Sequence, residues 1–206
     1  MSFEISDEEG IYLVRLARGA IETYLRSKKI IEPTDASEKL RTPCGVFTTL
    51  NKITAAGKEL RGCIGLPYPV KPLAEAVIAS AISSAVEDPR FPPLSKGELD
   101  EIVVEVSVLT PPQPIVVGKP SDYPKQVYVG VDGLIVERGA RSGLLLPQVP
   151  VEWGWDAEEF LTQCCLKAWL PPDSWLNEGT KISKFQAIIF EEKEPRGEVE
   201  RKKLSS

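Results

Sequence analysis

Three helix-forming segments are separated by strand and turn signals, and this order is the feature that most constrains the fold. Apolar residues at helical spacing predict helices at Asp7–Ser27, from Pro72 to just before Asp88, and at Ala157–Leu170. Between them the chain shows hairpin patterns, whereas a parallel sheet requires strands that alternate with crossover helices. We therefore expect an α+β fold with mixed or antiparallel sheets.

The helix starts carry recognisable signals. Ser6 with Glu9, and Asp156 with Glu159, have the spacing of capping boxes. Pro72 stands at the start of the second helix, where its fixed φ is tolerated. That helix is rich in Ala and Ser, which allow close packing against a sheet.

The strand pattern predicts two hairpins and two further strands. The expected strands are Gly45–Leu50 with Lys58–Ile64, Glu101–Leu109, Val127–Val131 with Leu134–Glu137, and Phe185–Phe190. Asp132-Gly133 favours a tight type I′ turn. Alternation within Glu101–Leu109 predicts a half-exposed strand with Glu105 on its less apolar face.

The composition excludes several functional classes. The chain of 206 residues contains no histidine, which removes Ser-His-Asp and Cys-His catalysis. Its formal net charge of -5 opposes binding to a DNA backbone and makes RNA binding a poor third hypothesis. Any chemistry must therefore use Cys, Asp, Glu, Lys, Arg or Tyr.

The chain shows no targeting or membrane signal. Its first ten residues are acidic, and its longest apolar stretch, Ala74–Val86, is too short to span a bilayer. We expect a cytoplasmic protein with reduced thiols and no membrane association. The small numbers of Asn, Gln and Met residues favour a thermophilic source.

One domain of two packed lobes is expected over residues 4–192, followed by a charged, frayed tail over 193–206.

The segment Leu60–Gly65 is the densest chemical signal. Strand alternation predicts that Arg61 and Cys63 project from one face, so that the guanidinium favours the thiolate. Gly62 and Gly65 leave room for a ligand or for another backbone. Alternatively, Cys63 is a small buried hydrophobe and the glycines serve a bulge.

The hairpin register decides whether Cys44 reaches Cys63. A turn centred on Thr54-Ala55 places Cys63 opposite Val46, with Cys44 as its diagonal neighbour. A loop longer or shorter by one pair places the two cysteines opposite each other. A slip of one residue places them on opposite faces.

A metal site is not expected. Cys164 and Cys165 are adjacent on a helix, about 100° apart, so they do not comfortably bind one metal ion. Cys164 shares the apolar stripe of its helix and is expected in the core. The sequence indicates no cofactor.

Two further segments carry candidate polar groups. Asp88 and Arg90 lie in a proline-stiffened loop that presents Arg90 to an anion, or pairs it with Asp88 internally. Glu105 serves as a general base, as a partner for Arg61 or Arg90, or as part of a solvated face.

Gln148 and Glu152 lie in a segment with two tryptophans, Leu146–Trp155. This segment is expected to be a loop. We expect that it either lines a pocket or covers the edge of the hydrophobic core with its aromatic side chains.

Several motifs together resemble the AMMECR-type family. They are Thr42-Pro43, Gly45-Val-Phe47, Leu60-Arg-Gly-Cys-Ile-Gly65, Asp88-Pro-Arg-Phe-Pro-Pro93, Glu105-Val-Ser-Val-Leu-Thr-Pro111, Gly143-Leu-Leu-Leu-Pro-Gln148 and Glu152-Trp-Gly-Trp155. The resemblance runs from the first helix to Glu192. It implies an α+β fold of a larger and a smaller lobe, with the hexapeptide near a cleft. Microbial relatives are associated with a radical-SAM protein and with a protein similar to the mediator of ErbB-driven cell motility, which implies a three-part modification system.

Two functional hypotheses follow. In the first, the chain is an enzyme or enzyme subunit in which Cys63 is a nucleophile or redox thiol. Arg61 lowers its pKa, and Glu105 or Asp88 moves protons. In the second, the chain is a non-catalytic binding or adaptor module for partner enzymes. Gly62, Gly65, Asp88, Arg90, Gln148 and Glu152 are then candidate ligand-binding residues.

Overall fold

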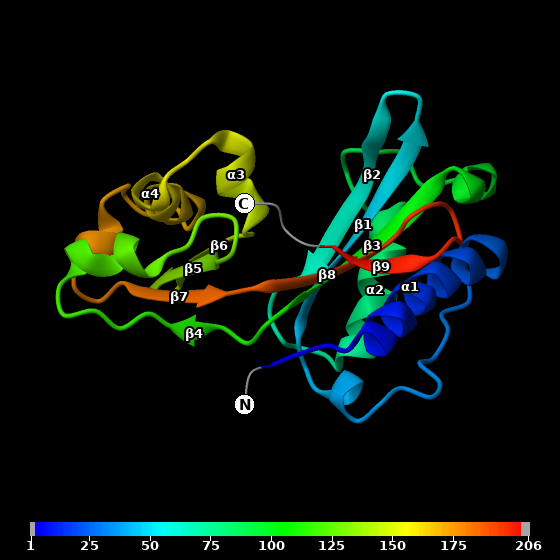
Figure 1. Ribbon diagram of the computed structural model, residues 1–206, viewed down its shortest axis with the longest axis horizontal. Helices are drawn as coiled ribbons and strands as arrows, with labels where there is room; N and C mark the ends of the chain where they lie inside the picture. The colour runs from blue at the N-terminus through cyan, green and yellow to red at the C-terminus, as the bar shows by residue number, and fades with distance from the viewer. Residues whose placement is uncertain (1–2, 203–206) are drawn as a thin grey trace. The chain divides into compact units, whose positions relative to one another are not determined.

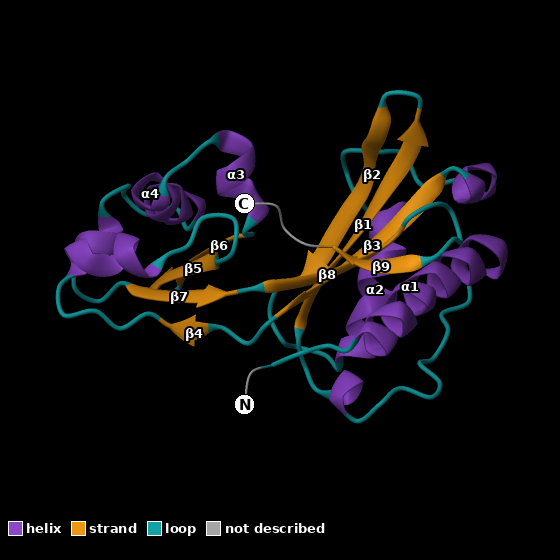
Figure 2. Cartoon of the chain, in the orientation of Figure 1, coloured by secondary structure: helices purple, strands orange, loops and turns teal. Residues whose placement is uncertain are grey.

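The computed structural model describes residues 3–202, and the chain divides into two compact units (Figure 1). Within that range the first unit comprises residues 3–109 and 188–202, and the second comprises residues 110–187. Each unit combines a β-sheet with helices, which confirms the predicted α+β class (Figure 2).

The first unit is built on a five-stranded sheet in the order β2-β1-β3-β8-β9. Its strands are β1 (Gly45–Thr54), β2 (Gly57–Leu66), β3 (Ile102–Leu109), β8 (Ala187–Glu192) and β9 (Val199–Lys202). Its α-helices are α1 (Asp7–Ser27) and α2 (Leu73–Val86). The strand β3 lies at the centre of the sheet, so its burial differs from that of the edge strands.

Helix α1 has the predicted bounds and the predicted cap. Glu9 donates its backbone N–H to Ser6 Oγ (3.2 Å), and Ser6 donates its own to Glu9 Oε2 (2.9 Å). These reciprocal bonds satisfy backbone donors that the first turn of a helix leaves unpaired. At the other end Lys28 adopts a left-handed φ of 59°, which ends the helix.

Helix α2 confirms the second predicted helix and packs on one face of the sheet. Its Ser80 hydroxyl lies 2.7 Å from the hydroxyl of Thr48 on β1, and both are buried. Val46 and Leu50 share that face of β1 and are fully buried in the same core as α1 and α2. Small residues on α2 thus allow the close contact that its composition predicted.

Strand β3 is buried on both faces, which corrects the half-exposed strand expected from alternation. All eight of its residues are buried, including Glu105 and Ser107. The reason is its central place, because β1 and β8 flank it and neighbouring side chains cover its polar face.

The second unit contains a four-stranded sheet in the order β4-β7-β5-β6. Its elements are β4 (Gln113–Pro114), β5 (Gly133–Arg138), β6 (Arg141–Leu145), α3 (Gln148–Trp153), α4 (Ala157–Lys167) and β7 (Lys181–Phe185). Helix α4 starts where predicted, since Asp156 accepts backbone N–H bonds from Glu158 and Glu159, but it ends before the predicted Leu170. Cys164 and Cys165 are buried in this unit's core.

The predicted hairpin about Asp132-Gly133 is wrong. Strand β5 starts at Gly133 and pairs with β6 and β7, whereas residues 127–131 form no strand. Asp132 is buried and accepts hydrogen bonds from the Tyr128 backbone (3.0 Å) and from Lys184 Nζ (3.1 Å). The aspartate therefore closes a turn before the strand instead of joining two strands.

The chain end differs from the expected frayed tail. Residues 199–202 form β9, which pairs antiparallel with β8, and the predicted last strand Phe185–Phe190 is divided between β7 and β8. Of the expected tail, Arg201 and Lys202 are part of this hairpin, and residues 203–206 lie outside the described residues. Opposite charges in the sequence mark long-range ion pairs here and not a solvated tail.

Candidate functional site

The β1–β2 hairpin sets the position of Cys63. Thr54 pairs with Gly57, and a bulge at Arg61 shifts the register so that Cys63 lies opposite Thr49. The expected pairing of Cys63 with Val46 is therefore wrong. Cys44 precedes β1 and is buried, and all four cysteines are free thiols.

Three side chains form a row across the sheet on the face opposite α2. Thr49 on β1 pairs with Cys63 on β2 and with Glu105 on β3. Cross-strand partners project from the same face, so the thiol, the hydroxyl and the carboxylate are neighbours. Thr49 Oγ1 donates a hydrogen bond to Cys63 Sγ (3.3 Å).

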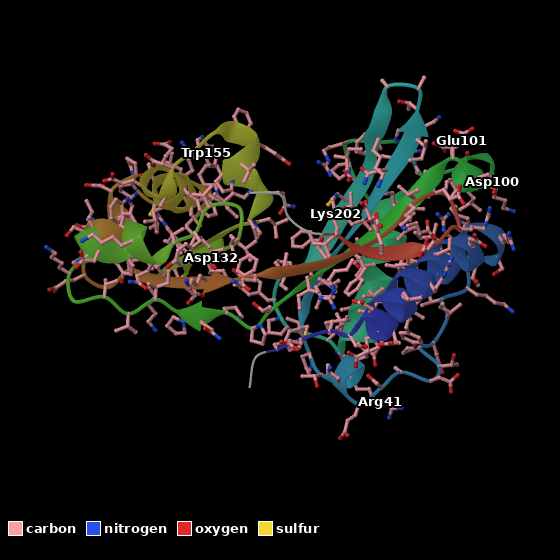
Figure 3. The ribbon with its side chains drawn as sticks, in the orientation of Figure 1. Arg41, Asp100, Glu101, Asp132, Trp155 and Lys202 are labelled. Atoms are coloured by element: carbon pink, nitrogen blue, oxygen red, sulfur yellow. The ribbon has the colours of Figure 1, made fainter. Side chains whose placement is uncertain are left out.

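Lys202 completes this row from strand β9. Lys202 is labelled on the ribbon in Figure 3. Its ammonium donates to Glu105 Oε2 at 2.9 Å and lies 3.8 Å from Glu191 Oε2. Burial alone lowers the pKa of Lys202, but the hydrogen bond and charge of Glu105 outweigh it and raise that pKa. Glu105 is thus buried and paired with a lysine, not solvated and not bound to Arg61 or Arg90 as expected.

Asp88 and Arg90 form a clasp on the outer edge of β2. Asp88 Oδ2 accepts the Cys63 backbone N–H (2.8 Å), and Arg90 Nη2 donates to the Cys63 carbonyl (3.2 Å). Arg90 also holds Asp88 through Nε (2.9 Å) and Nη2 (2.7 Å). The pair satisfies backbone groups that an edge strand leaves open, so the structural alternative stated for these residues is the observed one.

The ion pair with Arg90 strongly favours the ionised form of Asp88. Its side chain is 2% exposed and that of Arg90 is 53% exposed. The hydrogen bonds from Arg90 hold the pKa of Asp88 well below its usual range, even though burial acts in the opposite direction. Asp88 is therefore an anion at neutral pH.

The Cys63 thiol retains its proton more strongly than a free thiol. Burial raises the pKa of Cys63, and the charges of Glu105 and Asp88 add to that effect. The hydrogen bond from Thr49 and the charge of Arg90 act against it without reversing it. The thiolate expected from the motif is thus disfavoured, and the guanidinium near the thiol is that of Arg90, not Arg61.

Arg61 is engaged elsewhere. Its Nε and Nη2 donate to the two carboxylate oxygens of Glu98, at 2.7 and 3.3 Å. The hydrogen bond from Arg61 lowers the pKa of Glu98 to about 2. The guanidiniums of Arg61 and Arg90 lie 5.9 and 5.5 Å from the centre of the Phe91 ring. Arg61 therefore fixes the loop after α2 to the bulge of β2.

The two glycines of the hexapeptide are explained by packing. A Cβ at Gly62 would lie 2.2 Å from the Ser84 carbonyl oxygen of α2. A Cβ at Gly65 would lie 2.3 Å from the Phe47 ring. The open space expected beside the thiol is occupied by a helix backbone and by an aromatic ring.

Replacing Gly62 with alanine is expected to lower the free energy of unfolding by about 1–3 kcal/mol, because the α2 backbone cannot move away cheaply. Chemical denaturation of the full chain measures the change. Gly118→Ala is the matched control, since a Cβ there meets nothing within 4 Å. Equal stability of Gly62→Ala and the parent chain would show that α2 does not pack this closely.

Gln148 and Glu152 belong to the second unit and are not part of the row. They lie in the short helix α3, where a loop was expected. The Gln148 Oε1 atom is buried without a hydrogen-bond partner, and Glu152 is exposed. Trp153 and Trp155 stack with ring centres 6.0 Å apart, and Trp155 packs against the core of this unit.

The comparisons with known proteins agree with the family resemblance. The AMMECR1 family model matches residues 14–190. The chain belongs to the AMMECR1 family. It is 60% identical over 204 residues to a protein of Thermococcus gammatolerans, covering 98% of this chain and 99% of that relative.

A solved structure of this family has the same fold. The crystal structure of the uncharacterized protein PH0010 from Pyrococcus horikoshii aligns with a TM-score of 0.87 at 59% identity, covering 98% of this chain and all of that chain. Relatives from thermophilic archaea accord with the few Asn and Gln residues of the sequence.

Sequence reasoning missed two members of the row in this AMMECR1-family chain. Thr49 carries no motif of its own, and only the bulged register places it between Cys63 and Glu105. Lys202 was assigned to the tail, although a lysine that returns to the sheet through a short hairpin can reach a strand carboxylate.

Within residues 3–202, no group of His, Cys, Asp and Glu is arranged to hold a metal ion. In that same range no helix is long and apolar enough to cross a membrane.

Proposed function

We propose that this AMMECR1-family chain is a non-catalytic binding module of a modification system. The observation that carries the proposal is the protonation of the Cys63 thiol, whose pKa is raised by burial. A thiol that retains its proton at neutral pH is a poor nucleophile. The nearest guanidinium, on Arg90, is already held by the Asp88 carboxylate.

The same residues favour binding. Cys63 and Thr49 are half-buried and offer a neutral thiol and hydroxyl beside the Glu105–Lys202 ion pair. Such a surface accepts and donates hydrogen bonds without a charge of its own to neutralise. The partners we propose are the radical-SAM protein and the motility-mediator-like protein that the family resemblance implies. Four free thiols support a reducing compartment, and we propose the cytoplasm.

Site-resolved alkylation of the folded chain as a function of pH tests this proposal. We expect Cys63 to react with an apparent pKa above the ~8.5 of a free thiol. Cys44 serves as an internal reference, because burial raises its pKa to about 11. The variant Thr49→Val removes the hydrogen bond that lowers the pKa of Cys63, so its thiol should be alkylated still more slowly.

An enzyme that uses Cys63 is the second candidate, with Arg61 and Glu105 in the supporting roles expected from the sequence. The hydrogen bond from Thr49 and the charge of Arg90, which both favour the thiolate, support it. An apparent pKa of Cys63 below ~8.5 would transfer the proposal to this candidate.

A binding experiment tests the partner half of the proposal. Sedimentation of the full chain with each purified partner from the same genome should show a complex. In the reconstituted system Cys63→Ser should retain activity within about tenfold of the parent, because no bond forms at sulfur. Loss of all activity with the complex intact would favour the enzyme.

A further inference from the structure

The first unit contains an apolar groove away from the row of Cys63. Its volume is about 640 Å³, and it lies between α2, Tyr24 of α1 and the segment Ile30–Pro33 that follows α1. Its floor is formed by Ile78, Ala79 and Ile82, which share one face of α2 at helical spacing.

The sequence of α2 explains why this face is apolar. The helix is hydrophobic on nearly all sides, which is typical of a helix that is covered all round. The sheet and α1 cover two sides, and a further side faces the groove. On that side Ile78 and Ile82 are only 4% and 8% exposed, whereas Ile30 on the groove wall is 69% exposed. The apolar surface open to a partner is therefore that of Ile30 and of the half-buried Ala79.

The rim of the groove is acidic. Glu75 and Glu87 lie at the two ends of the α2 face, and Glu32 lies on the opposite wall. Among residues 3–202, Glu32 and Glu75 make no ion pair or hydrogen bond. Lys71 is the single cation of the described lining. Glu87 accepts a hydrogen bond from the Ser83 hydroxyl and makes no ion pair among the described residues. An apolar groove with carboxylates that lack a cationic partner attracts a partner that is apolar and positively charged.

We propose that this groove binds a basic amphipathic helix of a partner protein. Glu75 and Glu87 are twelve positions apart on one helix, a separation of about 18 Å at 1.5 Å per residue. This length suits three turns of a bound helix, with apolar anchors in the middle and basic side chains near both ends. A single compact small molecule does not reach both carboxylates. The inference is independent of the chemistry of Cys63.

Selection from a library of 16-residue helical peptides displayed on phage, with the full chain immobilised, tests the proposal. We expect enriched peptides to carry Leu, Ile or Phe at i, i+3 or i+4, and i+7, with Lys or Arg at both ends. Synthetic copies of these peptides are then titrated against the chain by fluorescence anisotropy. Glu75→Lys should weaken binding about tenfold or more, because an attraction becomes a repulsion.

Two variants control the experiment. Ala79→Leu fills the groove with a good helix former, so it should abolish peptide binding while circular dichroism remains unchanged. Glu178→Lys makes the same charge change at an exposed position outside the groove and should bind like the parent. Enrichment of acidic peptides, no enrichment, or binding that survives Ala79→Leu would overturn the proposal. Binding of decyltrimethylammonium below its micelle concentration, without binding of peptides, would assign the groove to small organic cations instead.

Discussion

Replacing Glu192 with alanine is expected to lower the free energy of unfolding by about 3–5 kcal/mol. Glu192 is fully buried on β8 and forms a bidentate pair with Arg18 of α1, which is 5% exposed. Removing the carboxylate leaves a buried guanidinium without its counter-charge, and this penalty exceeds the loss of one hydrogen bond. Denaturant titration of the parent and variant chains measures the change.

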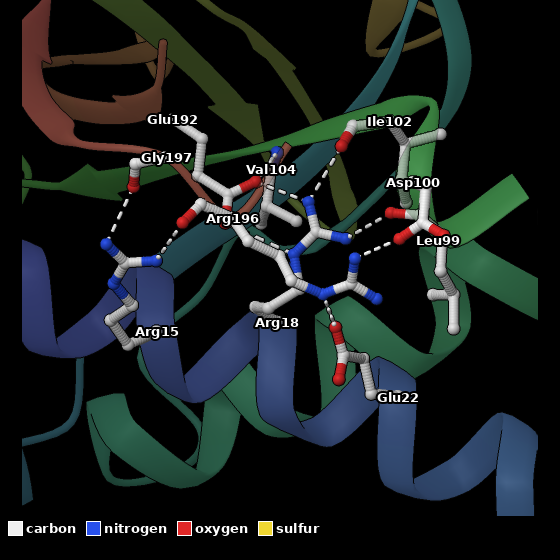
Figure 4. A network of polar contacts seen from close by, with 10 residues as sticks. All are labelled: Arg15, Arg18, Glu22, Leu99, Asp100, Ile102, Val104, Glu192, Arg196 and Gly197. Atoms are coloured by element: carbon white, nitrogen blue, oxygen red, sulfur yellow. Dashed lines mark hydrogen bonds and ion pairs between the residues drawn. The ribbon is translucent and has the colours of Figure 1, made fainter. Parts of the chain in front are cut away.

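The network around this pair explains the size of the effect (Figure 4). Arg18 also donates to the carbonyl oxygens of Leu99 (3.0 Å) and Ile102 (2.7 Å), and Glu192 Oε2 accepts the backbone N–H of Val104 (3.0 Å). One ion pair therefore joins the helix α1, the start of β3 and the strand β8. These elements are far apart in sequence, so the loss of the ion pair that joins them should lower the stability of the whole first unit.

A double-mutant cycle separates the penalty from the value of the pair. Arg18→Met with Glu192→Leu removes both charges and keeps apolar volume, so we expect it to be less destabilising than Arg18→Met alone or Glu192→Leu alone. A double variant as unstable as the sum of the single variants would show that the two residues act independently.

The helices were the most predictable part of the fold because their signals are local. The Ser6–Glu9 capping box gave the start of α1, and Pro72 with Asp88-Pro89 limited α2. The hairpin at Asp132-Gly133 was predicted wrongly because a lysine from β7, remote in sequence, holds the Asp132 carboxylate. Periodicity within a short segment contains no information about such a partner.

The candidate site was predictable in its residues but not in its contacts. The hexapeptide and the Asp88–Arg90 loop were singled out from sequence, and the structure joins them at the edge of β2. The position of the turn, with Thr54 opposite Gly57, and the bulged residue Arg61 together changed the register and with it the neighbour of the thiol. Because the side chains of a strand alternate, one extra residue is enough to exchange the faces of all those that follow.

Replacing Asp88 with asparagine is expected to lower the free energy of unfolding by about 2–3 kcal/mol at neutral pH. The carboxylate is nearly inaccessible and accepts bonds from the Cys63 backbone and from Arg90, and the amide group of asparagine would turn a donor toward Arg90. Hydrogen exchange at the Cys63 amide should become faster in the variant, because this bond is made by the replaced carboxylate.

The pH dependence of the Asp88 contribution has a definite sign. The pKa of Asp88 is lower in the folded chain than in the unfolded chain, so the unfolded chain binds the proton first. The stabilisation is complete above the unfolded pKa of about 3.9 and is lost as the pH falls from there toward the folded pKa. The stability difference between the parent and Asp88→Asn should therefore shrink below about pH 4.

Asp35→Asn is the matched control, since Asp35 is exposed and has a left-handed φ of 57° that asparagine also adopts. It should change the unfolding free energy by less than about 0.5 kcal/mol. A difference for Asp88→Asn that is absent at pH 7, or that persists unchanged in acid, would mean that the carboxylate charge does not hold the edge of β2.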